Sequence, residues 1–265
     1  MSKTRWLSCL VMTLAGVNLL AVEVPRNVAH RGFSAVFPEN TLSAVRGAIE
    51  AKANGCEMDV YRSKDGVVFL NHDGNLKRYC GVDRKVTELT WEELRKYEVG
   101  SFKNARFAGE KMPSLEEALL VLKESDCTPV IEIKQEGLEE DILALLKKHE
   151  MVDRSVIIAF SQKVCRRMRE LDADIFIAWL CSQGKEESED AYIKRIEKTL
   201  KECGLTAVDL HYNGVTSKLV ETLKKQGMTI MCWTINDPAT MEKVWKMGVD
   251  SITTDFPDRL NEVLK

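Results

Sequence analysis

From residue 27 onward, the chain shows two patterns of hydrophobic and polar residues, and segments of the one pattern are followed by segments of the other. Short apolar runs, several of them rich in valine and isoleucine, are typical of buried strands. Between them lie longer stretches in which apolar residues recur every three to four positions, as Leu42, Val45 and Ile49 do, and this spacing predicts helices. The predicted strands are 27–30, 56–62, 129–134, 155–160, 175–180, 207–212, 229–236 and 251–255, and the main helices are 41–51, 114–124, 138–150, 162–171, 190–202, 217–227 and 238–248, with a last short helix after the final strand.

Residues at the ends of these helices support their boundaries. Ser114 and Glu117 have the spacing of a capping box at a helix N-terminus. Pro238 suits the first position of a helix, whereas Gly227 and Gly248 suit the position at which a helix stops.

The order of these elements predicts the fold. Strict alternation of strand and helix requires a parallel sheet, and eight such units are the number that closes into a TIM (β/α)8 barrel. An open doubly wound sheet is the alternative, but the glycine-rich turn typical of its first strand is missing. We therefore expect an α/β protein with a TIM barrel formed by one domain, residues 23–265.

One segment is too long to be an ordinary connection. After the second strand, Asp65-Gly66 predicts a hairpin turn, and the following residues form a small insertion at approximately 74–112, with a short helix near 91–97. If the hairpin turn has two residues, Asp59 lies opposite His72 on the same face of the ribbon.

The first 22 residues differ from the rest of the chain. Lys3 and Arg5 precede an uncharged apolar run that ends in small residues, which is typical of a secretory signal peptide (1–22) cleaved near Ala21. A membrane-anchoring helix is the alternative, although the run is short for a span. We expect an exported protein, periplasmic or extracellular, with no stable membrane insertion once the signal is removed.

Composition adds few constraints. The 38 basic and 41 acidic side chains give a net charge of −3, which provides no electrostatic footprint for nucleic acid. Seven cysteines follow the leader, and their odd number and wide spacing do not predict a disulfide framework, although one or two bridges stay open. The oligomeric state is not determined by these patterns.

Charged residues lie where a barrel strand would normally be apolar. His30 and Arg31 end the first strand, Glu57 and Asp59 point the same way from the second, and Glu132 lies on the third. Carboxylates facing a barrel interior need compensation, and three of them offer the hard oxygen ligands of one divalent cation, Ca²⁺ or Mg²⁺. A buried salt-bridge network with Arg31 and Lys134 is the alternative. Lys134 follows Glu132 by two positions on the third strand.

These residue types together predict cleavage of a phosphodiester. Two histidines, His30 and His72, can serve as general acid and general base. Arg31 and Lys134 can contact phosphate oxygens, and a divalent cation neutralises charge on the phosphoryl group. Trp233, near the end of the seventh strand, is a candidate aromatic wall for an alcohol group.

At these residues the chain resembles the glycerophosphodiester phosphodiesterase family. The resemblance rests on AHRGFSAVFPENTLSA, CEMDVYRSKDGVVFLNHD, IEIK, WTIND and GVDSITTDFPD and covers essentially the whole chain after the leader. It implies a barrel enzyme that hydrolyses glycerophosphodiesters to an alcohol and sn-glycerol 3-phosphate. By resemblance, Glu57, Asp59 and Glu132 hold the cation, His30 and His72 are the acid/base pair, Arg31 and Lys134 contact the phosphate, and Glu39 supports the site.

Two other functions stay open at this point. A lysophospholipase D or another lipid-headgroup phosphodiesterase would need an apolar surface near the barrel mouth, for which Phe102 and Phe107 of the insertion are candidates. A binding protein without catalysis is a third hypothesis, but binding alone has no need of two histidines beside three carboxylates.

Overall fold

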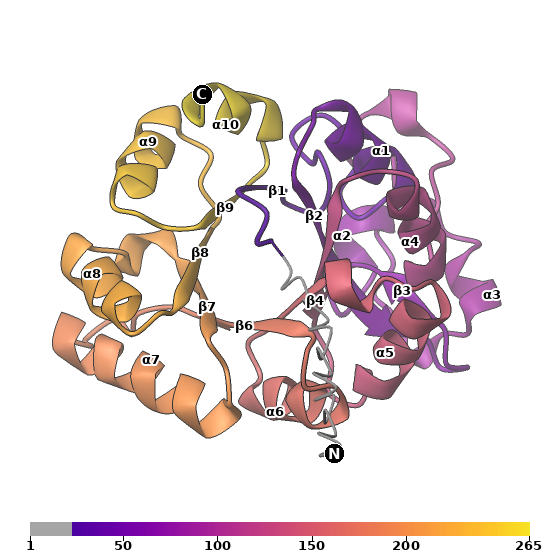
Figure 1. Ribbon diagram of the computed structural model, residues 1–265. Coiled ribbons are helices and arrows are strands. Elements are labelled where there is room, and N and C mark those ends of the chain that lie inside the picture. Colours follow the sequence, from indigo (N-terminus) through magenta and orange to yellow (C-terminus); the bar gives the residue numbers. More distant parts are fainter. Residues whose placement is uncertain (1–22) are drawn as a thin grey trace, which may run out of the picture.

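Eight parallel strands close into a barrel in the computed structural model, which describes residues 23–265 (Figure 1). The barrel closes because β1 pairs with β2 on one side and with β9 on the other. The predicted TIM barrel is therefore confirmed, with an additional antiparallel strand, β3, at the outer edge of β2. The strands are β1 (Asn27–Ala29), β2 (Gly55–Arg62), β3 (Val68–Leu70), β4 (Thr128–Ile133), β5 (Val156–Ala159), β6 (Phe176–Cys181), β7 (Ala207–His211), β8 (Thr229–Trp233) and β9 (Ser251–Thr254).

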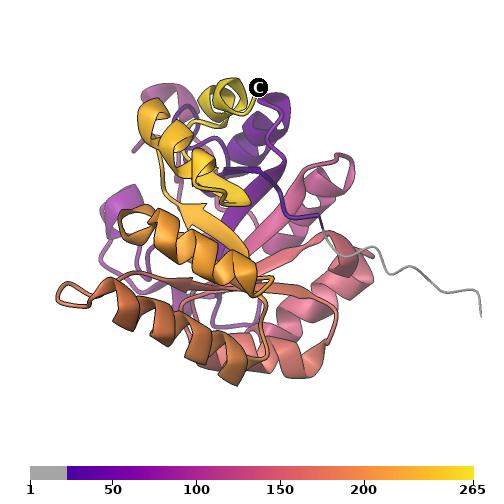
Figure 2. The same ribbon diagram turned by 60° about the vertical axis from the view of Figure 1, so that its left-hand side comes forward.

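Helices surround the barrel, and the last of them, α10, lies beside the first strand (Figures 1 and 2). Most of the long helices begin at a side chain that caps the first turn, such as Thr41, Ser114 and Asp237. The helices that follow the barrel strands are α1 (Leu42–Glu50), α4 (Leu115–Lys123), α5 (Glu139–Lys148), α6 (Gln162–Leu171), α7 (Glu189–Cys203), α8 (Ser217–Lys225), α9 (Pro238–Lys246) and α10 (Pro257–Val263), and short 3₁₀ turns lie at Val152–Arg154 and Tyr212–Gly214.

Alternation along each strand separates two apolar cores. Val130 on β4 packs with residues of other strands inside the barrel, whereas its neighbour Ile131 packs in the larger core between the strands and the helices. The inner core also contains Ala207 and Met231. Polar residues at later positions of the same strands can therefore face a cavity above this core.

The insertion forms a small separate core outside the barrel, next to β3. Phe69 of β3 packs there with Leu76, Leu94 and Met112. Its helical elements are α2 (Lys77–Cys80), α3 (Trp91–Leu94) and the 3₁₀ turns Val86–Glu88 and Ala105–Phe107. In Figure 1 α3 lies at the periphery, away from the centre of the barrel.

The predicted hairpin register is wrong by one residue. Tyr61 pairs with Phe69, and the Ser63 backbone N–H donates to the Val67 carbonyl oxygen, so the loop has three residues and not two. Gly66 occupies the left-handed region, with φ of 95°, which is the geometry of a three-residue hairpin loop. Asp59 consequently lies opposite Asn71, whose N–H donates to the Asp59 carbonyl oxygen at 3.0 Å, and His72 follows in the loop after β3.

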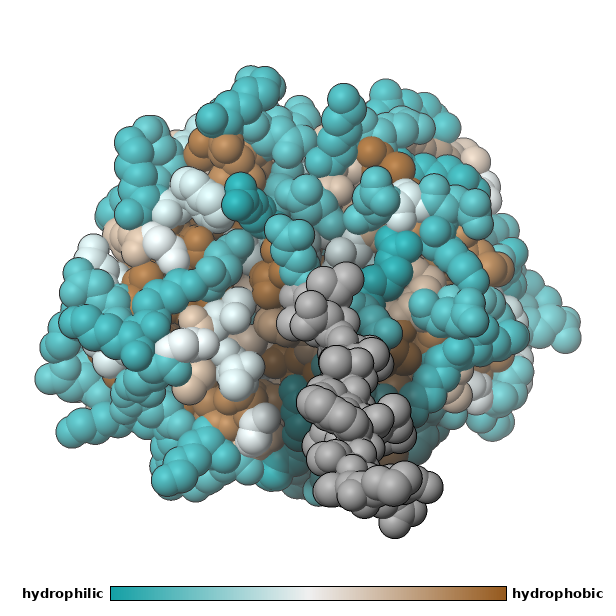
Figure 3. Space-filling view, in the orientation of Figure 1, coloured by the Kyte–Doolittle hydropathy of each residue, from teal (hydrophilic) through white to brown (hydrophobic). Residues whose placement is uncertain are grey.

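Figure 3 shows the face of the molecule seen in Figure 1, where hydrophilic residues predominate and hydrophobic ones are exposed in smaller groups. Within residues 23–265, no helix has the length and apolar character needed to cross a membrane. The seven cysteines of this part of the chain are free thiols, six of them buried. The predicted signal peptide lies outside the described residues.

Candidate active site

A cavity of about 270 Å³ lies at the carboxyl ends of the barrel strands. It brings together most of the residues predicted from the sequence, although they come from distant parts of the chain. Asp59 and Glu39 are not part of its lining and hold the lining residues from behind. The predicted residues in the lining are His30, Arg31, Glu57, His72, Glu132, Lys134 and Trp233.

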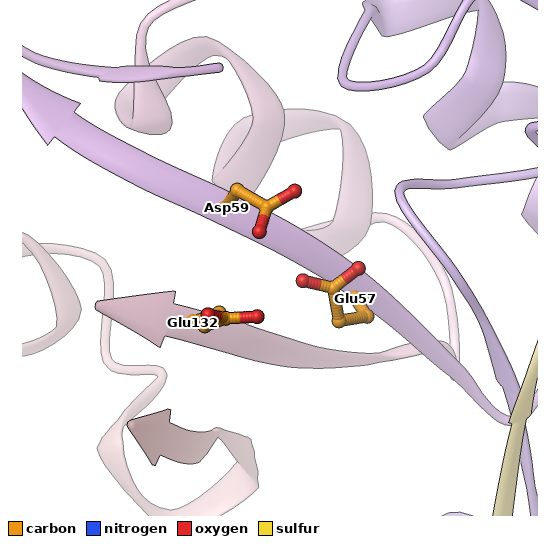
Figure 4. A group of neighbouring side chains, drawn as sticks. All are labelled: Glu57, Asp59 and Glu132. Atoms are coloured by element: carbon orange, nitrogen blue, oxygen red, sulfur yellow. The ribbon is translucent and has the colours of Figure 1, made fainter. Parts of the chain in front are cut away.

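Three carboxylates on two neighbouring strands face one another at one side of this cavity (Figure 4). Glu57 and Asp59 project from β2, and Glu132 is the register partner of Asp59 on β4. Each residue offers an oxygen atom that lies within 4.8 Å of the others. Glu57 and Asp59 are almost completely buried.

Burial and mutual repulsion perturb the acidity of this cluster. Burial, followed by the charges of Asp59 and Glu132, raises the pKa of Glu57 well above its usual range. Burial and then Asp59 also raise the pKa of Glu132 to about 7. Carboxyl groups with raised pKa values in a cavity mark a place where positive charge is needed.

Two basic side chains supply part of the positive charge that the carboxylates need. Lys134 Nζ lies 2.7 Å from Glu132 and 3.3 Å from Asp59, and Arg31 Nε lies 3.4 Å from Asp59. Glu57 has neither as a direct ion-pair partner, and among the described residues its Oε1 has no hydrogen-bond donor. The salt-bridge alternative therefore leaves one buried oxygen without a partner, whereas a hard divalent cation among the three carboxylates would bind it. The residues present fit such a cation.

Arg31 is held in an unusual backbone conformation, with φ of 55°. In this conformation its backbone N–H donates to Glu57 Oε2 at 2.7 Å, so the residue anchors the carboxylate cluster with its main chain. Gly32 also has a positive φ, and a Cβ there would lie 2.5 Å from the Ala44 backbone. Glycine is therefore required for the loop to pass this close to α1.

Glu39 has the supporting position that the resemblance implied. Its carboxylate accepts hydrogen bonds from Arg31 Nη1 at 2.9 Å, from Arg78 Nη2 at 2.6 Å and from the Tyr79 hydroxyl at 3.1 Å. Burial alone would raise the pKa of Glu39, but Arg78 and Arg31 outweigh it and lower the pKa to about 2. The ionised carboxylate thereby orients the Arg31 guanidinium at the cavity.

His30 is positioned by a carboxylate from the end of the last strand. Its Nδ1 lies 2.6 Å from Asp255 Oδ1, and Asp255 also accepts hydrogen bonds from Asn236 and Ser34. Burial would raise the pKa of Asp255, but these hydrogen bonds and the charge of His30 lower it to about 2. An ionised carboxylate only accepts, so Nδ1 carries a proton and Nε2 is the nitrogen left for a substrate.

His72 has an equivalent arrangement. Its Nδ1 lies 2.7 Å from Asp73 Oδ1, and Arg78 Nε donates to the other oxygen of Asp73 at 2.7 Å. Burial is the largest influence on His72 and lowers its pKa. Arg78 therefore connects the supports of His72 and Arg31, since it also binds Glu39.

Four of these positioning residues were not predicted as site residues: Asp255, Asp73, Arg78 and Asn40. Asn40 holds Asp59 twice, because its amide nitrogen donates to Asp59 Oδ2 at 2.8 Å and its oxygen accepts from the Asp59 N–H at 3.1 Å. The place of Asp255 directly after the last strand is a signal that could have identified it. Arg78 carries no such signal, because it lies within the insertion.

The opposite wall of the cavity consists mainly of aromatic and aliphatic side chains, with the carboxyl group of Asp209 among them. Trp233 packs edge-on against Phe160, with ring centroids 5.6 Å apart, and its indole N–H donates to the Asp209 carbonyl oxygen at 3.2 Å. Ile158 and Leu180 complete this wall. The cavity thus has an ionic side, suited to a phosphate and a cation, and an apolar side, suited to the carbon skeleton of an alcohol.

Comparison with known proteins identifies the family of this chain. Residues 30–259 match the Glycerophosphoryl diester phosphodiesterase family. A glycerophosphodiester phosphodiesterase of Caldanaerobacter subterraneus subsp. tengcongensis is 31% identical over 90% of this chain and 97% of its own length. One of Bacillus altitudinis is also 31% identical, over 87% of this chain and 94% of its own.

Solved structures show the same architecture. An Oleispira antarctica phosphodiesterase, in complex with the product sn-glycerol-3-phosphate, has a TM-score of 0.81 and 25% identity, covering 91% of this chain and 96% of its own. A Parabacteroides distasonis glycerophosphodiester phosphodiesterase has a TM-score of 0.73 and 28% identity, covering 90% and 98% of the two chains. The chain belongs to the glycerophosphoryl diester phosphodiesterase family. Both the predicted family and the predicted class of enzyme, a phosphoric diester hydrolase, are confirmed.

Proposed function

We propose that the protein hydrolyses glycerophosphodiesters to an alcohol and sn-glycerol 3-phosphate, with a divalent cation, Ca²⁺ or Mg²⁺, and with His30 and His72 as the acid/base pair. One observation carries the proposal. Two histidines, each bound at Nδ1 by a carboxylate, line the same cavity as Glu57 and Glu132, two of the three clustered carboxylates. The names of the relatives and the product in the Oleispira antarctica structure support the choice of substrate.

The cationic side chains bind the phosphate in this proposal. Arg31 and Lys134 line the cavity, and each is held by a carboxylate: Arg31 by Glu39, which lies behind the lining, and Lys134 by Glu132, which lines the cavity beside it. The planar guanidinium of Arg31 can donate two parallel hydrogen bonds to phosphate oxygens, whereas Lys134 contributes a compact charge. Trp233 provides an apolar surface for one of the ester groups.

The two histidines move the protons. One accepts a proton at Nε2 from the oxygen that attacks phosphorus, and the other donates a proton from Nε2 to the oxygen of the departing alcohol. Asp255 and Asp73 keep the Nδ1 proton in place and stabilise each ring when it is charged. When bound by Glu57, Asp59 and Glu132, a divalent cation supplies charge neutralisation at the phosphoryl group.

A lysophospholipase D activity is the second candidate. Phe102 and Phe107, the residues first considered for an apolar surface, pack against Tyr79 and Phe37 with centroids 5.1 and 5.8 Å apart. The observation that favours this function is instead Phe160, which lines the cavity and is 48% exposed. An acyl chain leaving the cavity would pass over this ring.

We also propose that the chain is exported through the signal peptide predicted at 1–22 and acts in the periplasm or outside the cell. Expression of the full chain followed by fractionation tests this, because an exported protein loses these residues and leaves the cytoplasmic fraction. Recovery of the uncleaved chain from the cytoplasm contradicts it.

A substrate panel tests the reaction. Purified protein is incubated with glycerophosphocholine, glycerophosphoethanolamine and a long-chain lysophosphatidylcholine, with and without chelator. Glycerol 3-phosphate is measured enzymatically for the two soluble diesters, and choline for the lysophosphatidylcholine, whose headgroup hydrolysis gives choline and lysophosphatidate. Release of glycerol 3-phosphate from the soluble diesters, lost on chelation and in both His30→Ala and His72→Ala, is the expected result. Full turnover by either histidine variant contradicts the mechanism, and strong preference for the lysolipid supports the second candidate.

A further inference from the structure

A fourth buried carboxylate, Asp209, faces the cavity from the side opposite the three clustered carboxylates. It lies on β7 and is 1% exposed. Its strand neighbours Val208 and Leu210 pack in the outer core, whereas Ala207 packs in the inner core. Because side chains alternate along a strand, Asp209 shares the inner face with Ala207. It also forms part of the cavity lining.

Within residues 23–265 this carboxylate has no compensating side chain. Among the described residues, neither Oδ1 nor Oδ2 of Asp209 has a hydrogen-bond partner. Its register partners on the adjacent strands are Leu180 and Met231, which offer no polar side-chain hydrogen. The charged group that acts on it is Glu132, which has the same sign, and burial followed by this charge raises the pKa of Asp209 well above its usual range.

Asp59 is a comparable buried aspartate on a barrel strand, but its side chain has partners within the protein. It is buried to the same extent, but Asn40 binds its side chain and Arg31 and Lys134 are close to it. A buried polar group without partners destabilises a protein, so such groups are rare outside functional sites. The partner of Asp209 is therefore expected to enter through the cavity, as part of a ligand.

The surroundings restrict what this partner can be. The wall around Asp209 is formed by Ile158, Leu180 and Trp233, which suits a carbon skeleton. A ligand group that meets this carboxyl group must be able to hydrogen-bond with it, as donor or as acceptor, and be small enough to reach a buried position. A hydroxyl group on a short carbon chain satisfies both conditions, whereas a trimethylammonium group has no hydrogen to donate.

We propose that Asp209 is a specificity-determining residue, which hydrogen-bonds a free hydroxyl group of the glycerol part of the substrate. The inference rests on the proposed hydrolysis of glycerophosphodiesters, because it assumes that the phosphate is bound by Arg31 and Lys134 on the ionic side of the cavity. The glycerol chain then extends across the cavity toward β7. A site built around a substrate hydroxyl discriminates strongly against an analogue without it, since the polar group of the protein is left unpartnered.

Deoxy substrates test this assignment. Values of kcat/KM are measured for glycerophosphocholine and for its two analogues in which one glycerol hydroxyl is replaced by hydrogen. For the unchanged protein we expect at least one analogue to be slower by about 100-fold or more. In Asp209→Leu the ratio of kcat/KM for glycerophosphocholine to kcat/KM for that analogue falls to about 10-fold or less. Asp209→Asn keeps the shape of the side chain and can still hydrogen-bond, so its ratio is intermediate.

Met231→Leu is the matched control, because Met231 is the register partner of Asp209 and a buried neighbour. Its ratio should equal that of the unchanged protein. An unaltered ratio in Asp209→Leu overturns the proposal. A second result would also overturn it. If the Asp209 variants lose a preference between glycerophosphoethanolamine and glycerophosphocholine but keep the preference for glycerophosphocholine over its deoxy analogues, then Asp209 binds the ammonium headgroup.

A binding measurement separates this inference from the proposed reaction. Calorimetry with Ca²⁺ present compares sn-glycerol 3-phosphate with inorganic phosphate, for the unchanged protein and for both Asp209 variants. Loss of the preference for glycerol 3-phosphate in Asp209→Leu, with retained affinity for phosphate, supports the inference even if no diester is hydrolysed. Equal loss of affinity for both ligands overturns it, whereas absence of turnover with normal binding contradicts only the proposed reaction.

Discussion

His30 and Asp255 lie at the ends of the first and last strands of the barrel, and their side chains meet with Nδ1 of the histidine 2.6 Å from Oδ1 of the carboxylate. The contact depends on barrel closure, because β1 and β9 pair only when the sheet closes on itself. It is the same relationship that His72 has with its sequence neighbour Asp73. Both histidine rings therefore carry the proton on Nδ1. For His30 this results from a contact between residues far apart in the sequence, and for His72 from a contact with the next residue.

Asp255→Asn is expected to lower kcat by about 10²- to 10⁴-fold, because the amide no longer fixes the Nδ1 proton or stabilises the charged ring. The measurement is of kcat and KM, determined separately with glycerophosphocholine. In the double variant with His30→Ala, the second substitution should add little, since both affect one proton transfer. Asp83→Asn, at an exposed ion pair with Lys77, is the control. Fully additive effects would show that Asp255 does not act through His30.

Removal of the divalent cation is expected to abolish activity and to reduce stability. A cation at 100 times its dissociation constant stabilises the folded protein by about 2.7 kcal/mol, which corresponds to roughly 5–10 °C in Tm for a chain of this size. Thermal unfolding with Ca²⁺, with Mg²⁺ and with chelator measures this shift.

Glu57→Gln and Glu132→Gln should lose the stabilisation by added cation, because each replaces a charged oxygen ligand. Glu116→Gln is a matched control, since Glu116 pairs with Lys148 and His149 outside the site. The same Tm increase in all three variants would be incompatible with a cation site at these carboxylates.

Glu39→Gln should destabilise the protein at neutral pH and progressively less in acid. The pKa of Glu39 is about 2 in the folded protein, compared with 4.5 for the free group, so its ionised form stabilises the fold at any pH above about 4.5. This contribution is lost as the pH falls from 4.5 toward 2. We expect a difference on the order of 2 kcal/mol at pH 7, measured by urea unfolding at pH 7, 5, 4 and 3. If the difference in unfolding free energy between the two proteins does not shrink below pH 4, the stabilisation does not come from the ionised carboxylate of Glu39.

Two glycines with positive φ should respond differently to alanine. Gly66→Ala is expected to cost about 1–2 kcal/mol, because only the backbone conformation is unfavourable and no atom lies within 4 Å of the added Cβ. Gly32→Ala should cost about 3 kcal/mol or more, since its Cβ would also overlap the Ala44 backbone. Because Gly32 directly follows His30 and Arg31 in the turn after β1, Gly32→Ala should lower activity as well as stability, whereas Gly66→Ala should lower stability alone. Equal unfolding free energies for the two variants would contradict this account.

Local patterns were sufficient to predict most of the fold and much of the site. The strand and helix periods of the eight units determined a parallel barrel, and strand ends then located His30, Glu57, Asp59 and Glu132 on one edge. The hairpin register failed, because the number of residues in its loop depends on whether Lys64 belongs to the turn. Asp65-Gly66 is compatible with both loop lengths, and the three-residue loop places Gly66 in the left-handed region.

The two-residue period along each predicted strand was enough to locate the barrel strands and the side chains that point inward. Which inward residues have partners could be seen only in the folded protein, because the partners come from other elements. Asp59 and Asp209 are both aspartates on barrel strands with apolar neighbours in the chain, yet the first is held by Asn40 and the second has no partner among the described residues. That difference arises from side chains brought in by loops and neighbouring strands, whose positions are set by barrel closure and not by the residues beside each aspartate.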